Sequence, residues 1–128
     1  MVLTRVEDAR KSGVGVYVMV RASAARQDGQ SASLTAPNGQ SQQLLMRAAW
    51  SESGLRVSSA SYVEAHGTGT PLGDPIEIGS TAAVFCGERA EGDSLFVSSL
   101  KGNVGHMEGA AGLGGVLAAI LALSLIHI

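Results

Sequence analysis

Residues 62–77 read YVEAHGTGTPLGDPIE. The first of these residues are strand formers, and His66 stands where a strand expected over residues 61–65 should end. Asp74 can accept hydrogen bonds from the free N–H groups of a helix predicted over residues 75–86, and proline is well tolerated in a first helical turn. The loop in between therefore joins the carboxyl end of a strand to the amino end of a helix, which is the usual ligand position in open α/β sheets.

This loop is rich in residues that suit a binding site. Its glycines permit positive φ angles or a close approach of the backbone to a ligand, and its threonines present hydroxyl groups. The residues concerned are Gly67, Thr68, Gly69, Thr70 and Gly73. We interpret the stretch as an active-site loop.

The same order of elements occurs a second time. A strand predicted over residues 95–100, LFVSSL, runs into the polar loop KGNVGH at residues 101–106, and a helix of small residues follows at 109–123. Because the carboxyl ends of parallel strands open at one edge of a sheet, we expect His66 and His106 to lie together.

The upstream sequence completes an alternating α/β pattern. Residues 14–20, VGVYVMV, are almost continuously apolar and predict a strand that is buried on both faces. Residues 21–40 are small and polar and predict a long ordered loop. A helix is expected over about 40–53, with Leu44 on its apolar face and Gly54 at its end. This alternation predicts a parallel sheet covered by helices.

Composition narrows the class of protein. The 128 residues are 45% hydrophobic, which suffices for one domain with a core of aliphatic side chains. A net charge of -2 without a basic stripe argues against a nucleic-acid partner. Cys86 is the single cysteine, and we expect it to be a packed thiol rather than a nucleophile. The lack of a disulfide partner and of an apolar amino-terminal signal predicts a reducing location, the cytoplasm or an organelle.

The sequence gives little support to three other interpretations, namely a nucleotide site, a membrane span and a metal site. Neither GxxxxGK[ST] nor GxGxxG occurs, so the glycine loop does not carry a nucleotide-binding pattern. The apolar run that begins at residue 109 approaches the roughly 20 residues of a membrane span, but its glycines suit a buried helix better. A metal site could be drawn from four side chains that lack the HExxH or CxxC spacing, namely His66, Asp74, His106 and Glu108.

VEAHGTGTPLGDPIE at residues 63–77 and SSLKGNVGHMEGAAGLGG at 98–115 closely resemble the carboxyl-terminal part of β-ketoacyl synthases, specifically the ketosynthase domains of polyketide synthases. The upstream SLTAPNGQSQQLL resembles the same family. The resemblance covers residues 14–123, which leaves 1–13 as the end of a preceding segment and 124–128 as a truncated or foreign tail. It implies an α/β fold of the thiolase-like, layered αβαβα type, of which this chain holds only the carboxyl-terminal part.

The resemblance also implies a reaction, the decarboxylative Claisen condensation of acyl thioesters. The substrates would be carried on the phosphopantetheine arm of an acyl carrier protein, and the enzyme would be a homodimer without a bound cofactor or metal. By motif match, His66, His106 and Lys101 are the catalytic residues, and Thr68 and Thr70 line the pantetheine channel. Two neutral imidazoles that present N–H donors would stabilise the enolate that forms when CO₂ is lost.

The sequence also departs from the family. The nucleophilic cysteine of the family belongs to a motif upstream of anything present here, and Cys86 does not occupy its place. Gly102 replaces the serine that usually follows the lysine, and Arg26 replaces the usual asparagine of an NQDG loop. The resemblance therefore implies a ketosynthase fragment that is inactive alone. Alternatives are a non-catalytic ketosynthase-like partner that binds acyl carrier protein, and a small module that binds acyl thioesters or nucleotides.

Overall fold

The computed structural model describes residues 2–29 and 36–125, and its described part is organised around a parallel pair of strands. Strand β1 (Tyr62–Glu64) pairs with β2 (Phe96–Ser98), with Tyr62 opposite Phe96 and Glu64 opposite Ser98. The parallel pairing expected from the sequence is therefore confirmed. The described helical elements are α1 (Val6–Ser12), α2 (Gly39–Ser53), α3 (Gly73–Phe85), α4 (Lys101–Val104), α5 (Ala111–Leu125) and the 3₁₀ turns η1 (Val57–Ser59) and η2 (Glu108–Ala110).

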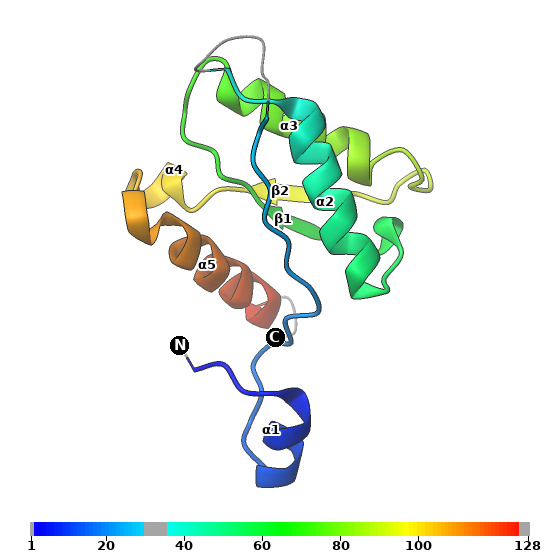
Figure 1. Cartoon of the computed structure of the whole chain (residues 1–128), viewed down its shortest axis with the longest axis vertical. Helices are drawn as coiled ribbons and strands as arrows, with labels where there is room; N and C mark the ends of the chain where they lie inside the picture. The colour runs from blue at the N-terminus through cyan, green and yellow to red at the C-terminus, as the bar shows by residue number, and fades with distance from the viewer. Residues whose placement is uncertain (1, 30–35, 126–128) are drawn as a thin grey trace.

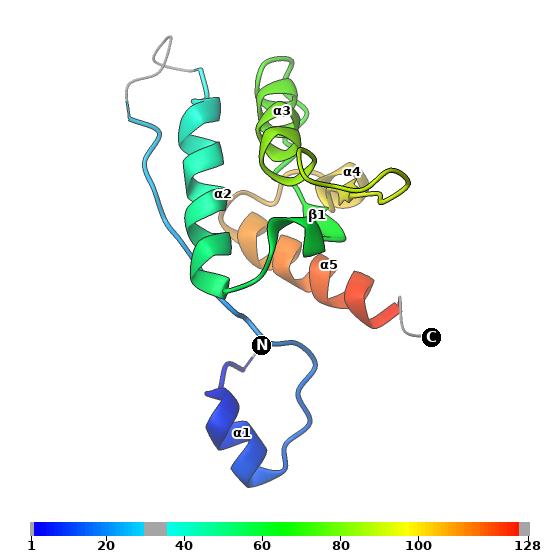
Figure 2. The ribbon, with the colours of Figure 1, turned by 90° about the vertical axis from the view of Figure 1, so that its right-hand side faces the viewer.

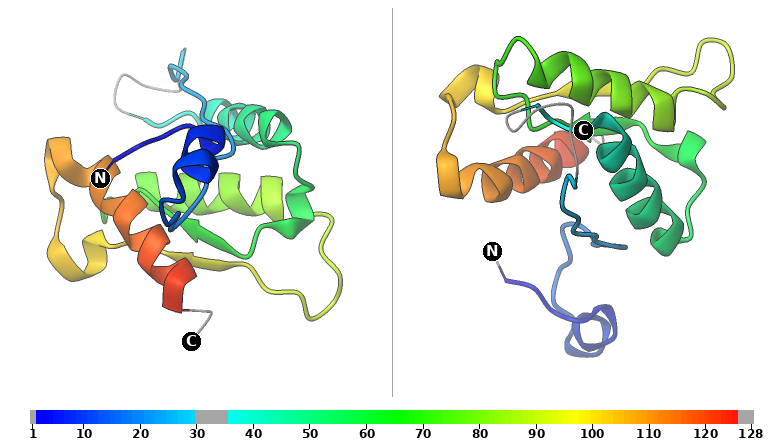
Figure 3. Two further views of the ribbon diagram at one scale, coloured as in Figure 1. Left: turned by 90° about the horizontal axis from the view of Figure 1, so that it is seen from below. Right: turned by 45° about the horizontal axis from the view of Figure 1, so that its top comes forward.

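The helices cover the strand pair from two sides. Figure 1 shows α2 and α3 together on one side of the sheet, with α5 beyond the other. The views of Figure 3 agree, since α3 and α5 lie on opposite sides of the strands. The carboxyl ends of both strands lead away toward the same end of the molecule, where the loop before α3 and the short helix α4 are found (Figure 1).

The core lies between α2, α3 and the sheet. Phe85 and Val84 of α3 are buried there, and Met46 and Trp50 of α2 pack against them. The Trp50 and Phe85 rings meet edge to face, with centroids 5.0 Å apart. The expectation that Leu44 faces the core is wrong, because its side chain is 50% exposed. The inward face of α2 is set by the position of α3, and it presents the large side chains of Met46 and Trp50.

Helix boundaries in this chain follow local signals. The Asn38 Oδ1 accepts hydrogen bonds from the backbone N–H groups of Gln40 and Ser41 at 3.0 and 3.1 Å, which caps the start of α2. Gly54 follows the end of α2 with a left-handed φ of 70°. Gly13 ends α1 in the same way, with a φ of 66°. The helix end predicted from Gly54 is therefore confirmed.

The predicted strand over residues 14–20 is wrong. These residues form neither strand nor helix, and most of their side chains are exposed, Tyr17 by 93%. A strand needs a hydrogen-bonded neighbour, and no third strand lies beside β1 or β2 in the described part of the chain. Figures 1 and 2 show this segment running alone from α1, which stands apart from the other helices. Of the predicted loop 21–40 and tail 124–128, residues 30–35 and 126–128 lie outside the described residues.

Two further local expectations are wrong. Residues 101–104 form the helical turn α4 instead of an open loop. Cys86 is exposed and not packed, because Val84 and Phe85 already occupy the inward face at the end of α3. The apolar carboxyl-terminal run forms the 15-residue α5, and none of the helices over residues 2–29 and 36–125 has the length and apolar character needed to cross a membrane.

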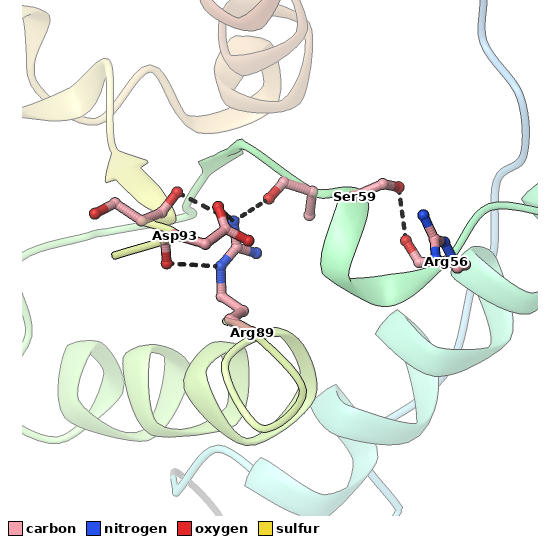
Figure 4. A network of polar contacts seen from close by, with 6 residues as sticks. Arg56, Ser59, Arg89 and Asp93 are labelled. Carbon is pink, nitrogen blue, oxygen red and sulfur yellow. Dashed lines mark hydrogen bonds and ion pairs between the residues drawn. The ribbon is translucent and has the colours of Figure 1, made fainter. Parts of the chain in front are cut away.

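Arg89 lies beside the amino-terminal ends of both strands, and its side chain is 6% exposed. Its Nη2 donates hydrogen bonds to the carbonyl oxygens of Ala60 at 2.7 Å and Ser94 at 3.1 Å, and to Asp93 Oδ1 at 3.1 Å. Figure 4 shows these hydrogen bonds around the Arg89 guanidinium. Because Ala60 precedes β1 and Ser94 precedes β2, one arginine ties together the starts of both strands.

Candidate active site

The loop that follows β1 depends on its glycines. Gly67 and Gly69 have φ angles of 49° and 76°, which side chains other than glycine rarely adopt. A Cβ at Gly67 would lie 2.7 Å from the Cβ and Oγ of Ser99, and a Cβ at Gly73 would overlap the Thr70 Oγ1. The positive φ expected of these glycines is present at Gly67 and Gly69. The close approaches in the loop are to the Ser99 and Thr70 side chains, and an approach to a ligand stays a prediction.

A carboxylate of α3 fixes the backbone at the first histidine. The Glu77 side chain accepts hydrogen bonds from the N–H groups of His66 at 2.6 Å and Gly67 at 2.9 Å. Bonds of this kind to an ionised acceptor are among the stronger ones in proteins. Sequence reasoning gave Glu77 no role. Its spacing from Asp74, which puts both carboxylates on one face of a first helical turn, is the signal that could have found it.

Asp74 also turns back toward the loop. Both of its carboxylate oxygens lie 3.2 Å from the N–H of Gly69. The prediction that Asp74 caps a helix over residues 75–86 is therefore wrong, since α3 already begins at Gly73 and the carboxylate binds the preceding loop. Thr70 lies within the same turn, where its Oγ1 accepts the Gly73 N–H at 3.1 Å.

The second histidine has one ring nitrogen engaged. The N–H of Glu108 donates to the His106 Nδ1 at 3.3 Å. An acceptor at Nδ1 places the proton of a neutral imidazole on Nε2, which leaves an N–H donor at the other end of the ring. Glu108 has a φ of 47°, the one positive φ outside glycine among the described residues.

Two segments, which we call the histidine loops, meet at the carboxyl edge of the sheet: the one after β1 that carries His66, and the one after β2 that carries His106. The rings of His66 and His106 lie perpendicular to one another with centroids 5.7 Å apart. The Ser99 hydroxyl, just beyond β2, donates to the His66 carbonyl oxygen at 3.4 Å. The sequence places these histidines at the ends of two parallel strands, and the structure brings their rings together there.

A cavity of about 460 Å³ opens at this edge. Its volume is in the range of small-molecule sites. His106, Lys101 and Thr68 line it, whereas His66 and Thr70 are not part of its wall. The His66 ring contacts the His106 ring. The carboxylate-bearing residues Asp74 and Glu77 also contribute to the lining, as do Ala65, Gly67, Gly69, Ile78, Val97, Ser98, Ser99, Gly102 and Gly105.

The chemical groups of the site are imidazole and amine side chains. Within residues 2–29 and 36–125, no group of three or more His, Cys, Asp or Glu side chains is placed to hold a metal ion. The site contains a pair of imidazoles, one of which accepts the Glu108 N–H at Nδ1, and a lysine that lines the same cavity. Such donors can stabilise negative charge that develops on a substrate oxygen.

Solved structures identify the class of protein. Over 94% of this chain, the structure superimposes with a TM-score of 0.86 and 37% identity on 21% of the ketosynthase from module 6 of the bacillaene synthase from Bacillus subtilis 168. An oxazolomycin ketosynthase domain from Streptomyces albus gives 0.84 at 35% identity over 91% of this chain and 20% of that one. The fold is therefore the carboxyl-terminal part of a thiolase-like ketosynthase.

Sequence comparison gives the family. The model of the "Beta-ketoacyl synthase, C-terminal domain" family matches residues 17–126, so this chain belongs to the β-ketoacyl synthases. Two relatives, each matched over 96% of this chain, are a phenolphthiocerol/phthiocerol polyketide synthase of Mycobacterium tuberculosis, at 49% identity, and erythronolide synthase EryA3 of Saccharopolyspora erythraea, at 46%. The chain spans only 6% and 4% of the length of those two proteins.

Proposed function

We propose that residues 14–123 provide the histidine side of a polyketide ketosynthase active site, which catalyses decarboxylative Claisen condensation of acyl thioesters. The observation that carries this proposal is the contact of the His66 and His106 rings beside a cavity lined by Lys101 and Thr68. Family membership supports the reaction class, and the similarity to polyketide synthases supports the substrate class.

In this proposal the imidazoles act as hydrogen-bond donors. Loss of CO₂ from a malonyl thioester moves negative charge onto the thioester oxygen, and donors aimed at that oxygen lower the barrier. His106 is suited to this role because its Nδ1 accepts the Glu108 N–H, which leaves the Nε2 proton for the substrate. Lys101 adds positive charge to the cavity wall, and Thr68 and Thr70 would contact the pantetheine arm.

Condensation also needs a thiolate that carries the growing acyl chain. Cys86 does not meet this need, since its thiol is exposed at the end of α3 and does not line the cavity. We therefore propose that this chain alone is inactive, and that the nucleophile comes from a region matching the rest of a ketosynthase. Acyl carrier protein as partner, a homodimer and a cytoplasmic location belong to the same proposal.

The test uses a hybrid ketosynthase, in which residues 14–123 replace the matching part of the bacillaene module 6 enzyme. With malonyl and acyl thioesters on carrier protein, we expect condensation by the hybrid and none by the 128-residue chain. His66→Ala and His106→Ala should each slow malonyl decarboxylation about 10²–10³-fold, the usual effect of removing one oxyanion donor. Cys86→Ala serves as the control and should retain the parent rate.

Three results would contradict the proposal. They are a His66→Ala hybrid that decarboxylates at the parent rate, an inactive parent hybrid that is correctly folded, and turnover by the isolated chain that disappears with Cys86→Ala. If the hybrid is inactive while the chain binds acyl carrier protein, the non-catalytic alternative becomes the better description.

A further inference from the structure

The N–H of Leu100 leaves the regular hydrogen-bond ladder of the sheet. Phe96 donates to the Ser61 carbonyl oxygen, and the register pairs Val63 with Val97. With the even spacing of a parallel ladder, the Leu100 N–H would continue this series to the Ala65 carbonyl oxygen. It donates instead to the Glu64 Oε1 at 2.6 Å. A side-chain carboxylate therefore replaces a backbone acceptor where β2 turns into α4.

The other oxygen of Glu64 is also used. The Tyr62 hydroxyl donates to its Oε2 at 2.5 Å. A tyrosine hydroxyl is already protonated at neutral pH, and burial, followed by this hydrogen bond, raises the pKa of Tyr62 further above its ordinary value. Helix α5 packs over the pair, and a Cβ at Gly115 would come within 3.3 Å of the Glu64 Cγ. The carboxylate is thus held in one place by two donors and by the helix above it.

This carboxylate connects the bases of both histidine loops. Glu64 lies two residues before His66, and its hydrogen-bond partner Leu100 directly precedes Lys101 and α4, which lead to His106. A shift of Leu100 would move α4 relative to the loop that carries His66. The distance and orientation of the His106 ring relative to the His66 ring would then change. Glu64 itself does not line the cavity, so any effect on chemistry passes through the residues that it holds.

We propose that Glu64 is a positioning residue of the ketosynthase reaction, one that sets the placement of Lys101 and His106 relative to His66. The inference rests on the proposed function, because it concerns the same site. A misplacement of about 1 Å at a reacting centre can cost on the order of 10²-fold in rate, which is the effect expected when the carboxylate is removed. Glutamine should substitute well, since its oxygen can accept from Leu100 while its NH₂ donates to the Tyr62 oxygen.

The test compares Glu64→Ala and Glu64→Gln in the hybrid ketosynthase, with Glu52→Ala, an exposed glutamate of α2, as the matched control. Glu64→Ala should lower the kcat of malonyl decarboxylation about 10²-fold, with KM and the rate of cysteine acylation near those of the parent. Glu64→Gln should stay within about tenfold of the parent, because a neutral hydrogen bond replaces a charge-assisted one. Tyr62→Phe should have a smaller effect than Glu64→Ala, since the Leu100 contact survives.

The outcomes separate this inference from the proposed function. Parent-like decarboxylation by Glu64→Ala, in a hybrid where His66→Ala and His106→Ala are impaired, would overturn the inference alone. Equal losses in decarboxylation and acylation, matched by a fall in thermal stability and not relieved by Glu64→Gln, would show a general structural role and also overturn it. If the parent hybrid is inactive, its crystal structure with Glu64→Ala decides, because Leu100 and His106 in unchanged positions would refute positioning.

Discussion

Replacing Gly67 with alanine tests how closely the two histidine loops must approach. Two costs can be read from the structure. The φ of 49° is unfavourable for a residue with a Cβ by about 1–2 kcal/mol. The added methyl group would lie 2.7 Å from the Cβ and Oγ of Ser99. Such overpacking typically costs about 1–3 kcal/mol in addition to the backbone cost.

Gly69→Ala provides the matched control. Gly69 lies in the same loop with a φ of 76°, but a Cβ there would meet no atom within 4 Å. It should cost only the backbone term of about 1–2 kcal/mol. The excess caused by Gly67→Ala then measures the contact with Ser99, and the double variant Gly67→Ala/Ser99→Gly should recover much of that excess.

The assay combines urea unfolding midpoints of the hybrid ketosynthase with rates of malonyl decarboxylation. Gly67→Ala should lower both more than Gly69→Ala does, because the overlap pushes Ser99 and the end of β2 away from His66. Equal effects of the two alanine variants, or no recovery with Ser99→Gly, would refute the reasoning that these loops are in essential contact.

Two predictions concern other parts of the chain. Arg89→Ala should lower the free energy of unfolding by about 3 kcal/mol or more, because several oxygen atoms at the amino-terminal ends of the strands lose a charged donor. The control Arg56→Ala, which changes an exposed side chain, should alter the free energy of unfolding by no more than about 0.5 kcal/mol. Equal urea midpoints for these two variants would contradict this assignment. Because Val14, Val16 and Tyr17 are exposed, the 128-residue chain alone should self-associate in size-exclusion chromatography with light scattering, and Val16→Glu/Tyr17→Lys should reduce this. A monodisperse parent monomer would count against it.

The local chemistry of the sequence determined much of the site. Strand-forming residues that end at a histidine, followed by glycines and a helix, occur twice, and this repetition was enough to predict parallel strands with His66 and His106 at one edge. Gly54 likewise marked the carboxyl end of α2. Such features are readable because the interactions involved join residues that are close in sequence.

Tertiary structure decided which partners those residues take. Asp74 looked like a helix cap but binds the loop behind it, and Glu77 and Glu64 became important only when their carboxylates met N–H groups from separate turns of the chain. The apolar residues 14–20 have the composition of a buried strand, yet most of them are exposed, since no strand in the described part of the chain lies beside them to supply hydrogen bonds. The composition of a segment shows whether it could be buried, whereas its actual burial depends on surfaces contributed by distant residues.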